Sequence, residues 1–402
     1  MKPDKSAPSA QTDQSVACDR PTNDEVSTTE GTRIMSRTRF PWNRLVGPIG
    51  VDLSPDAPRA MQVRHGPDAP LCATTVRVAP GATLVDRASA CVQQMRRANF
   101  TGREVVVGLP SGFVRMAVTR LPQLRGPDAR EAVAWEAAER CGMPREALVA
   151  DALPTGAPSN SHEGKEEHLM VAAPSEELSE ALGVLVDAGY EPVAVEPRFA
   201  AIARALSRRS RRDADVADVR AVLHIEQEGS VVLVLRGDRI SFCREIPTGG
   251  AAFDRAVAER LSVPIESAAA LRASRLAAMR GLGNPVDTVT EEAALGATRA
   301  SLDALVGEVA LCLRYFGVTF RGGQPARVVL SGPHGAEPRL AGLIEESCRS
   351  TVVSCEDELP NAAGSADLGV VGGAGPTSMA DWIACFGLAC RSRALMLSEA
   401  AA

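Results

Sequence analysis

Two short stretches of the chain share one pattern of apolar and polar positions. The first has an apolar run over residues 46–53, a polar turn, and a second β-rich run over residues 59–64. The second repeats this arrangement over residues 220–226 and 230–236, with Gly229 in the turn. Short apolar runs that flank a polar turn are typical of β-hairpins. The pattern therefore predicts the same hairpin twice, once in each half of the chain.

The rest of the chain alternates between strand patterns and helix patterns. Further strands are expected at residues 70–78, 104–109, 114–121, 149–153, 168–173, 193–195, 239–246, 328–330 and 352–353. Helices are expected where apolar residues recur about every third or fourth position, at 82–98, 127–141, 175–188, 198–206, 251–261, 264–279, 290–316, 335–347 and 379–395. This alternation predicts an α/β protein.

Two polar segments interrupt the pattern. Residues 1–40 are rich in Ser, Thr, Asp, Pro and Gln. Such a composition buries too little apolar surface to offset the entropy of folding, so we predict a disordered tail. An arginine-rich run at 208–212, followed by acids from Asp213, is expected to be an exposed connector between the two halves.

Charge, lysine content and cysteine content narrow the classes of function. The formal net charge of −6 gives no reason to expect a nucleic-acid partner. The lysines are Lys2, Lys5 and Lys165, all in polar segments, so a catalytic lysine is not expected. Ten cysteines without a C-x-x-C pair indicate free thiols in a reducing compartment. No signal sequence or membrane-spanning run is recognisable, and a cytoplasmic location is expected.

The duplicated hairpin carries an acidic residue, Asp52, at the end of its first strand. This combination points to a two-lobed nucleotide-binding fold of the actin and sugar-kinase type. We expect a first lobe over residues 41–207 and a second lobe over residues 208–375. A C-terminal helix over residues 376–402 is expected to return to the first lobe.

A series of short motifs extends this interpretation over residues 46–392. In chain order they are Gly-Val-Asp-Leu at 50–53 with Arg59, Val-Gly-Leu-Pro-Ser at 107–111, the segment 130–137 around Trp135, 172–174, 188–190, 195–197, Arg244 before Thr-Gly-Gly at 248–250, 308–316, Leu-Ser-Gly at 330–332, and Gly-Leu-Ala-Cys-Arg at 387–391. Taken together in this order, they resemble the PilM family of type IV pilus assembly proteins. That family is related to the division protein FtsA within the actin-like superfamily.

The resemblance implies an actin-like fold with an inserted small subdomain of the FtsA and PilM type, at about residues 103–155. It also implies a cytoplasmic scaffold, peripheral to the inner membrane, that binds the N-terminal cytoplasmic peptide of a PilN-like protein. The peptide groove would be flanked by residues 115–121 and 128–141, with Arg115 and Trp135 as candidate contacts. Trp135 has an alternative role as the core anchor of its helix. The sequence leaves the oligomeric state open.

In the actin-like superfamily, two hairpin turns hold phosphates through backbone N–H groups, and acids at the strand ends hold magnesium. The positions that match such a site here are Asp52, Ser54, Arg59, Ser230, Gly249, Gly250, Gly332 and Gly335. In the first turn, Pro55 and Pro58 remove two N–H donors, and Asp56 adds negative charge. In the second, His224 and Glu226 replace the usual acid and glycine.

These defects predict a vestigial site with weak or no binding of ATP and magnesium. One contact between Glu226 and a phosphate opposes binding by roughly 4 kcal/mol at an effective dielectric constant near 20. No cofactor is expected, no metal except magnesium at Asp52 if ATP binds, and the protein is expected to be a pseudo-ATPase. The glycines at 249–250 and 332–335 have an alternative explanation in tight backbone turns. The histidines and acids at 162–168 are expected to form a solvated loop rather than a metal site.

Two other functions stay open. An active actin-like ATPase or sugar kinase would use the same fold, and the missing second acid and the prolines of the first turn count against it. A component of type II secretion like the cytoplasmic part of GspL would also be a scaffold, and the lack of a transmembrane pattern counts against that function.

Overall fold

The computed structural model describes the chain in ten segments. They are residues 46–55, 57–64, 69–122, 127–155, 165–209, 218–279, 287–319, 323–359, 370–371 and 378–391. The tail expected at residues 1–40, Asp56 of the first turn and residues 162–164 of the loop expected at 162–168 lie outside the described residues. Residues 165–168 of that loop are instead the first residues of a strand, Lys165–Pro174.

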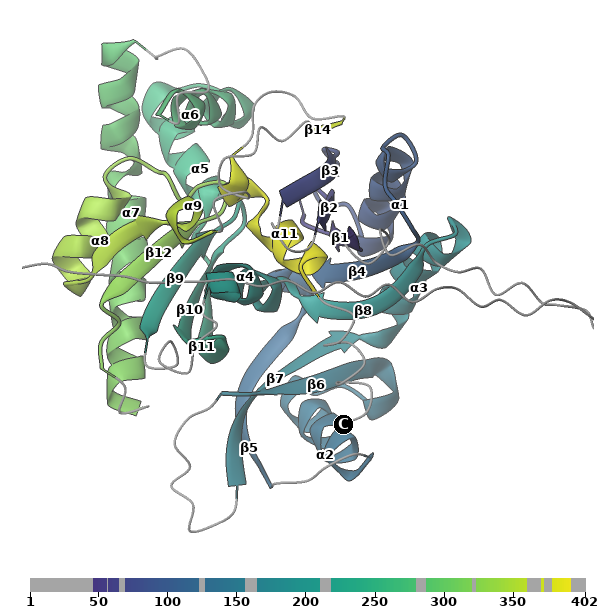
Figure 1. The fold of residues 1–402 in the computed structure, drawn as a ribbon. Coiled ribbons are helices and arrows are strands. Elements are labelled where there is room, and N and C mark those ends of the chain that lie inside the picture. The colour runs from purple at the N-terminus through teal and green to yellow at the C-terminus, as the bar shows by residue number, and fades with distance from the viewer. Residues whose placement is uncertain are drawn as a thin grey trace, which may run out of the picture. The chain divides into compact units, whose positions relative to one another are not determined.

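A six-stranded sheet contains the first predicted hairpin (Figure 1). Its strands lie in the order β14-β3-β2-β1-β4-β8, with bounds Val370–Val371, Ala69–Thr75, Arg59–Arg64, Val46–Asp52, Glu104–Leu109 and Glu191–Pro197. β1, β2 and β3 form an antiparallel meander, whereas β1, β4 and β8 are parallel. β1 is buried on both faces, which explains its continuous apolar run.

Four helices pack on this sheet in two pairs. The pairs are α1 with α3 and α4 with α11, with bounds Leu84–Met95, Ser175–Asp187, Arg198–Leu206 and Ile383–Ala389. α11 comes from the far end of the chain and packs on β1, β2 and β4. A Cβ atom at Gly387 would lie 1.9 Å from the carbonyl oxygen of Ala201, so glycine is needed where α11 crosses α4.

A five-stranded sheet repeats the strand order of the first sheet. Its order is β11-β10-β9-β12-β13, with bounds Arg239–Ile246, Ser230–Arg236, Val219–Ile225, Arg327–Ser331 and Thr351–Ser354. An antiparallel meander again begins at the first strand, β9, and two parallel strands lie on its other side. The helices of this half are α5 to α9, with bounds Gly250–Leu261, Ile265–Met279, Thr288–Thr319, Leu340–Cys348 and Cys355–Glu358. The equal strand order confirms the predicted duplication.

A third sheet and α2 (Pro127–Cys141) form a small subdomain with its own apolar core. The strands lie in the antiparallel order β5-β7-β6, with bounds Arg115–Pro122, Lys165–Pro174 and Leu148–Pro154. These bounds differ from the expected 103–155, because β4 lies in the first sheet and β7 supplies the central strand of the small one. β4 pairs with two parallel neighbours, which is why it reads as one continuous buried run.

Two helices begin or end differently from their expected bounds. The helix expected from residue 335 begins at Leu340, because Arg339 before it has a left-handed backbone conformation with φ 68°. The helix expected from residue 379 is a single turn followed by α11, and its expected end lies outside the described residues. Single 3-10 turns occur at Ser111–Phe113, Arg145–Ala147, Ser207–Arg209 and Met379–Asp381. None of the described helices is both long and apolar enough to span a membrane.

Candidate functional site

The first hairpin turn uses its polar side chains to hold itself together. Asp52 ends β1, and its side chain is buried. The hydroxyl of Ser54 donates a hydrogen bond of 2.7 Å to the carbonyl oxygen of Ala57. Arg59 Nη1 donates to the same Ser54 oxygen at 3.4 Å, and its guanidinium lies 5.7 Å from the ring of Trp382. The structure therefore brings these three candidate residues together, within contacts of the chain itself.

The second hairpin turn is closed in the same way. The hydroxyl of Ser230 donates to the carbonyl oxygen of Thr248 at 2.6 Å. The N–H groups of Gly250 and Ala251 donate to the carbonyl oxygens of Glu226 and Gln227, at 2.8 and 2.7 Å. These backbone donors, which a phosphate would need, are thus taken by the turn itself.

The candidate glycines lie where two backbone segments touch. A Cβ atom at Gly249 would be 2.5 Å from the carbonyl oxygen of Glu226, and one at Gly332 would be 2.4 Å from that of Ile225. Gly332 also has φ 88°, and a Cβ atom at Gly335 would be 2.7 Å from the carbonyl oxygen of Ser331. Tight packing of the backbone therefore accounts for Gly249, Gly332 and Gly335, the alternative that the sequence left open.

Arg198 lies between the ends of the two hairpins. Its Nε atom is 2.7 Å from Oδ1 of Asp52, and its Nη1 atom is 2.5 Å from Oε1 of Glu226. His224 Nε2 lies 3.2 Å from the same Glu226 oxygen, and His224 Nδ1 makes a 2.9 Å hydrogen bond with Oγ of Ser331. We call Asp52, Arg198 and Glu226 the Arg198 bridge. It joins the end of β1 in the first sheet to the end of β9 in the second.

Burial and charge act in opposite directions within the Arg198 bridge. Burial raises the pKa of Glu226, but Arg198 and His224 outweigh it and hold that pKa at about 2. At Asp52 burial prevails, so its pKa is raised although Arg198 and Arg59 lower it. Burial lowers the pKa of Arg198, but Asp52 and Glu226 raise it above the usual arginine value. The guanidinium is therefore permanently charged.

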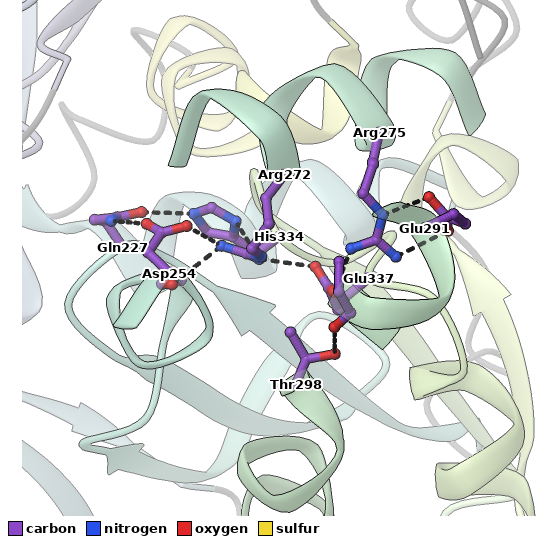
Figure 2. Close-up of polar contacts among 10 residues, drawn as sticks. Gln227, Asp254, Arg272, Arg275, Glu291, Thr298, His334 and Glu337 are labelled. Carbon is purple, nitrogen blue, oxygen red and sulfur yellow. Dashed lines mark hydrogen bonds and ion pairs between the residues drawn. The ribbon is translucent and has the colours of Figure 1, made fainter. Parts of the chain in front are cut away.

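A second group of buried ions lies inside the second half (Figure 2). Arg272 of α6 donates to Oδ1 of Asp254 at 2.5 Å and to Oε2 of Glu337 at 2.7 Å. Arg275, one turn further along α6, donates to Glu291 of α7 at 2.7 and 3.0 Å. We call these five residues the Arg272 network. They connect α5, α6, α7 and the turn that precedes α8.

His334 fills the space beside the backbone of Gly250. A Cβ atom at Gly250 would lie 2.1 Å from Nε2 of the His334 ring. The same nitrogen makes a 2.9 Å hydrogen bond with Oε1 of Gln227, whose amide donates to Asp254 at 2.7 Å. Figure 2 shows the ring between Gln227 and Arg272. The imidazole thus occupies the approach to Gly250.

A further carboxylate at the carboxyl edge of the first sheet is also paired. Glu196 lies near the end of β8, and Arg204 donates to its two oxygens at 2.5 and 2.6 Å. Arg391, beyond α11, donates to the same carboxylate. Glu196 therefore attaches the C-terminal end of the described chain to α4.

A magnesium nucleotide does not fit the residues present. Asp52 is paired with Arg198, the N–H groups of Gly250 and Ala251 are taken, and His334 covers Gly250. Among the described residues, no group of three His, Cys, Asp or Glu side chains is arranged to hold a metal ion. Glu226 is paired with Arg198, so its charge is not free to repel a phosphate in the way that the sequence alone suggested.

Sequence reasoning missed Arg198, Arg272, Arg275 and His334. Each pairs with residues far away in the chain, and no local motif marks such contacts. Two signals were nevertheless visible. Arg198 opens a helix directly after Pro197, where a cation is unfavourable, and His224 and Glu226 stand where the superfamily has an acid and a glycine.

The two candidate partner residues lie in different surroundings. Trp135 of α2 is 60% exposed and lines an open hollow of about 750 Å³ between the end of β5, α2 and the turn at Arg145–Ala147. The guanidinium of Arg145 lies 5.3 Å from the Trp135 ring. Arg115 begins β5 and does not line this hollow. Its positive charge instead lowers the pKa of Glu245 of β11, in the second sheet.

Glu245 is an acid with an unusual proton affinity beside the small subdomain. Burial raises its pKa to about 7, and Glu226 adds to the rise, whereas Ser111 and Arg115 oppose it. Nearby, the hydroxyl of Ser241 donates to the carbonyl oxygen of Thr155 at 3.0 Å. β11 and the small subdomain are therefore in direct contact.

Comparisons with known proteins agree with this architecture. No protein-family model matches the sequence, and no curated protein is significantly similar to it. A chain of the PilM-PilN type IV pilus biogenesis complex has a TM-score of 0.66 and 21% identity, over 86% of this chain and 97% of that chain. The chain has the actin-like fold. The ethanolamine utilization protein EutJ from Carboxydothermus hydrogenoformans is less similar, with a TM-score of 0.46 and 13% identity over 86% of this chain and 89% of that one.

The fold likeness agrees with the motif resemblance to the PilM family. At 21% identity it shows the fold and not the activity. The predicted α/β actin-like class with an inserted small subdomain is confirmed.

Proposed function

We propose that the protein is a cytoplasmic assembly scaffold that binds a peptide of a PilN-like inner-membrane protein without a nucleotide. The likeness of fold to a chain of the PilM-PilN complex supports this proposal. One observation on this chain carries it. The small subdomain presents an open hollow of about 750 Å³ beside α2, with Trp135 at its wall.

The exposure of Trp135 favours a partner-facing role over that of a core anchor. The core under α2 is formed by Val133 and Ala137, together with Leu121, Leu148, Met170 and Ala172 of the small sheet. Trp135 is not part of that core, and 60% of its surface is exposed. Exposed tryptophans beside hollows are frequent energetic centres of protein interfaces.

The small sheet also offers main-chain recognition. β5 and β6 are its edge strands, and Val118 and Val149 on them are 42% and 54% exposed. An extended peptide gains main-chain hydrogen bonds at such an edge and specificity from neighbouring apolar surface. An extended peptide suits this geometry, and the N-terminal cytoplasmic peptide that the family resemblance implies would be such a ligand.

Peptide binding at the hollow and at the edge strands would not require a phosphate. The hollow and the edge strands belong to the small subdomain, and the Arg198 bridge and the Arg272 network lie outside it. The residues of the would-be nucleotide site are engaged with one another. The protein would therefore act as a scaffold and a pseudo-ATPase, peripheral to the inner membrane through its partner.

The direct test is a calorimetric titration of the full chain with the N-terminal cytoplasmic peptide of a PilN-like protein from the same organism. We expect micromolar affinity without ATP, and at least about tenfold weaker binding by Trp135→Ala. Tyr315→Ala is the matched control, because Tyr315 is an aromatic residue of similar exposure on α7 in the other half. Point variants are preferable to deleting residues 103–155, which would also remove β4 from the first sheet.

Two results would refute the proposal. The first is no binding of the peptide at concentrations up to about 1 mM, a weak limit for any specific partner. The second is equal weakening by Trp135→Ala and Tyr315→Ala, which would show that the hollow is not the binding site.

A further inference from the structure

The two acids of the Arg198 bridge stand at similar places in the duplicated hairpins. Asp52 is the last residue of β1, and Glu226 directly follows β9. The two strand ends belong to different sheets, and they lie close enough for one side chain to reach both. Here both acids contact the same guanidinium. The place between the turns is therefore occupied by the chain itself.

The acids need a cation between them. Asp52 is 1% exposed and the Glu226 side chain 15%, and each carboxylate disfavours the charge of the other. One oxygen of Asp52, Oδ2, has no hydrogen-bond partner among the described residues. Two buried like charges without a counter-ion would push the strand ends apart. Arg198 supplies that counter-ion with a fixed positive charge.

The position of Arg198 in its helix also indicates a role beyond helix stability. It is the first residue of α4, after Pro197, and the first turn of that helix contains no acid. The N-terminus of a helix carries a partial positive charge, so a cation there is unfavourable for the helix. The two acids of the hairpins compensate for this placement.

We propose that Arg198 takes the place of a bound ligand in this fold: its guanidinium is a built-in cation that holds the two hairpin ends together. Arg198 is part of the chain and its guanidinium is permanently charged, so the ion pairs keep the two ends joined whether or not a nucleotide is present. This inference does not depend on the PilN-like partner, and it stands if that partner is wrong.

The test is hydrogen exchange on the full chain. The amides of Leu53 and Glu226 report on the two ends, because they are hydrogen-bonded to Gly108 and Gly229. We expect Arg198→Met to speed exchange at residues 49–55 and 223–230 by at least about tenfold. Arg275→Met is the matched control: Arg275 is equally buried beside two acids, but within one half. It should leave both segments within about twofold of the wild type.

A second variant separates charge from packing. In Asp52→Asn/Arg198→Met/Glu226→Gln, all three charges are gone, so the acids no longer repel each other. We expect this triple variant to recover most of the protection that Arg198→Met loses. The triple variant is also informative if Arg198→Met alone fails to fold. A triple variant that folds would then show that the uncompensated charges of the two acids, and not the loss of the arginine stem, prevent folding.

Three outcomes overturn the inference. Unchanged exchange in Arg198→Met would show that the Arg198 bridge does not hold the two hairpin ends together. Faster exchange at only one of the two segments would make Arg198 a local residue of one half. A triple variant as loose as Arg198→Met, or as unable to fold, would show that the arginine acts through its packed stem and not through its charge.

Discussion

The Arg198 bridge and the Arg272 network place the same chemical groups in different settings. In each, a buried guanidinium lies between two carboxylates: Arg198 between Asp52 and Glu226, and Arg272 between Asp254 and Glu337. The contacts of Arg272 are well-aligned hydrogen bonds, and Asp254 receives a further one from Gln227. Asp52, in contrast, keeps one oxygen without a hydrogen-bond partner among the described residues.

The difference lies in what each group connects. All members of the Arg272 network belong to the second half, so the network fixes helices that are already neighbours. The Arg198 bridge connects the ends of β1 and β9, which belong to different sheets. Buried ions are a poor way to gain stability, but they specify which groups meet. The Arg272 network therefore serves packing within the second half, whereas the Arg198 bridge joins the two halves.

The largest expected effect comes from the Arg272 network. Arg272→Met should lower the free energy of unfolding by about 3–5 kcal/mol, because it leaves Asp254 buried without its counter-ion and Glu337 with only the more distant Arg275. Urea denaturation of the full chain measures this. Arg299→Met is the control, since Arg299 is 74% exposed in its pair with Asp303, and it should change stability by less than about 0.5 kcal/mol. Similar effects of both variants would show that the burial of the Arg272 ion pairs does not determine their contribution to stability.

An intermediate effect is expected at Glu226 in acid. Its pKa of about 2 lies below the usual 4.5, so its carboxylate stabilises the native state above about pH 4.5, and this contribution is lost as the pH falls towards 2. The stability gap between wild type and Glu226→Gln should therefore narrow by up to about 3 kcal/mol between pH 5 and pH 2. Urea denaturation across that range measures the gap. Glu259→Gln, at an exposed position, should show no such narrowing.

A smaller effect is expected at Glu245, because this residue is only partly buried. Its pKa of about 7 lies above the usual 4.5, so the native state loses stability as the pH rises from about 4.5 through 7. Glu245→Gln should flatten this dependence, by no more than about 1–2 °C in melting temperature. A melting-temperature series from pH 5 to 7.5 measures it. An unchanged slope would mean that burial and the charge of Glu226 do not raise the pKa of Glu245.

The smallest expected effect is that of ATP and magnesium, because the Ser54 hydroxyl and the N–H groups of Gly250 and Ala251 already donate hydrogen bonds within the chain. The melting temperature should shift by less than about 1 °C at millimolar nucleotide, since a weak ligand adds little stability. Calorimetry is the second measurement. A dissociation constant below about 10 μM, or turnover abolished by Asp52→Ala, would contradict both the vestigial site and the role of Arg198.

The sequence predicted the parts of the fold that depend on local patterns. Both hairpins, the long helix α7 and the strand β4 lie close to their expected bounds, because apolar periodicity directly reflects which faces are buried. The extent of the small subdomain was less accessible. Whether β4 or β7 joins the small sheet depends on pairing between distant strands, and a run of valines does not reveal its neighbours.

For the candidate site, the sequence predicted only the departures from the nucleotide-binding motif. Pro55, Pro58, His224 and Glu226 are visible as departures from a motif, and they indicated a poor phosphate site. What fills the site was not visible, because Arg198 meets Asp52 and Glu226 only after both sheets have formed. For the same reason the acid at position 226 was interpreted as a repelling charge, whereas in the structure it is paired.

The origin of α11 in the chain has a consequence for synthesis on the ribosome. Its Cys385 thiol donates a hydrogen bond to the carbonyl oxygen of Gly50, 335 positions earlier. At about 5–20 residues per second, β1 waits roughly 20–70 s for this partner. During that time the apolar surface that α11 will cover stays open to water and to chaperones, while the strands and helices of the second half are already being made. A chain that is truncated before α11 would therefore leave β1 without its packing partner.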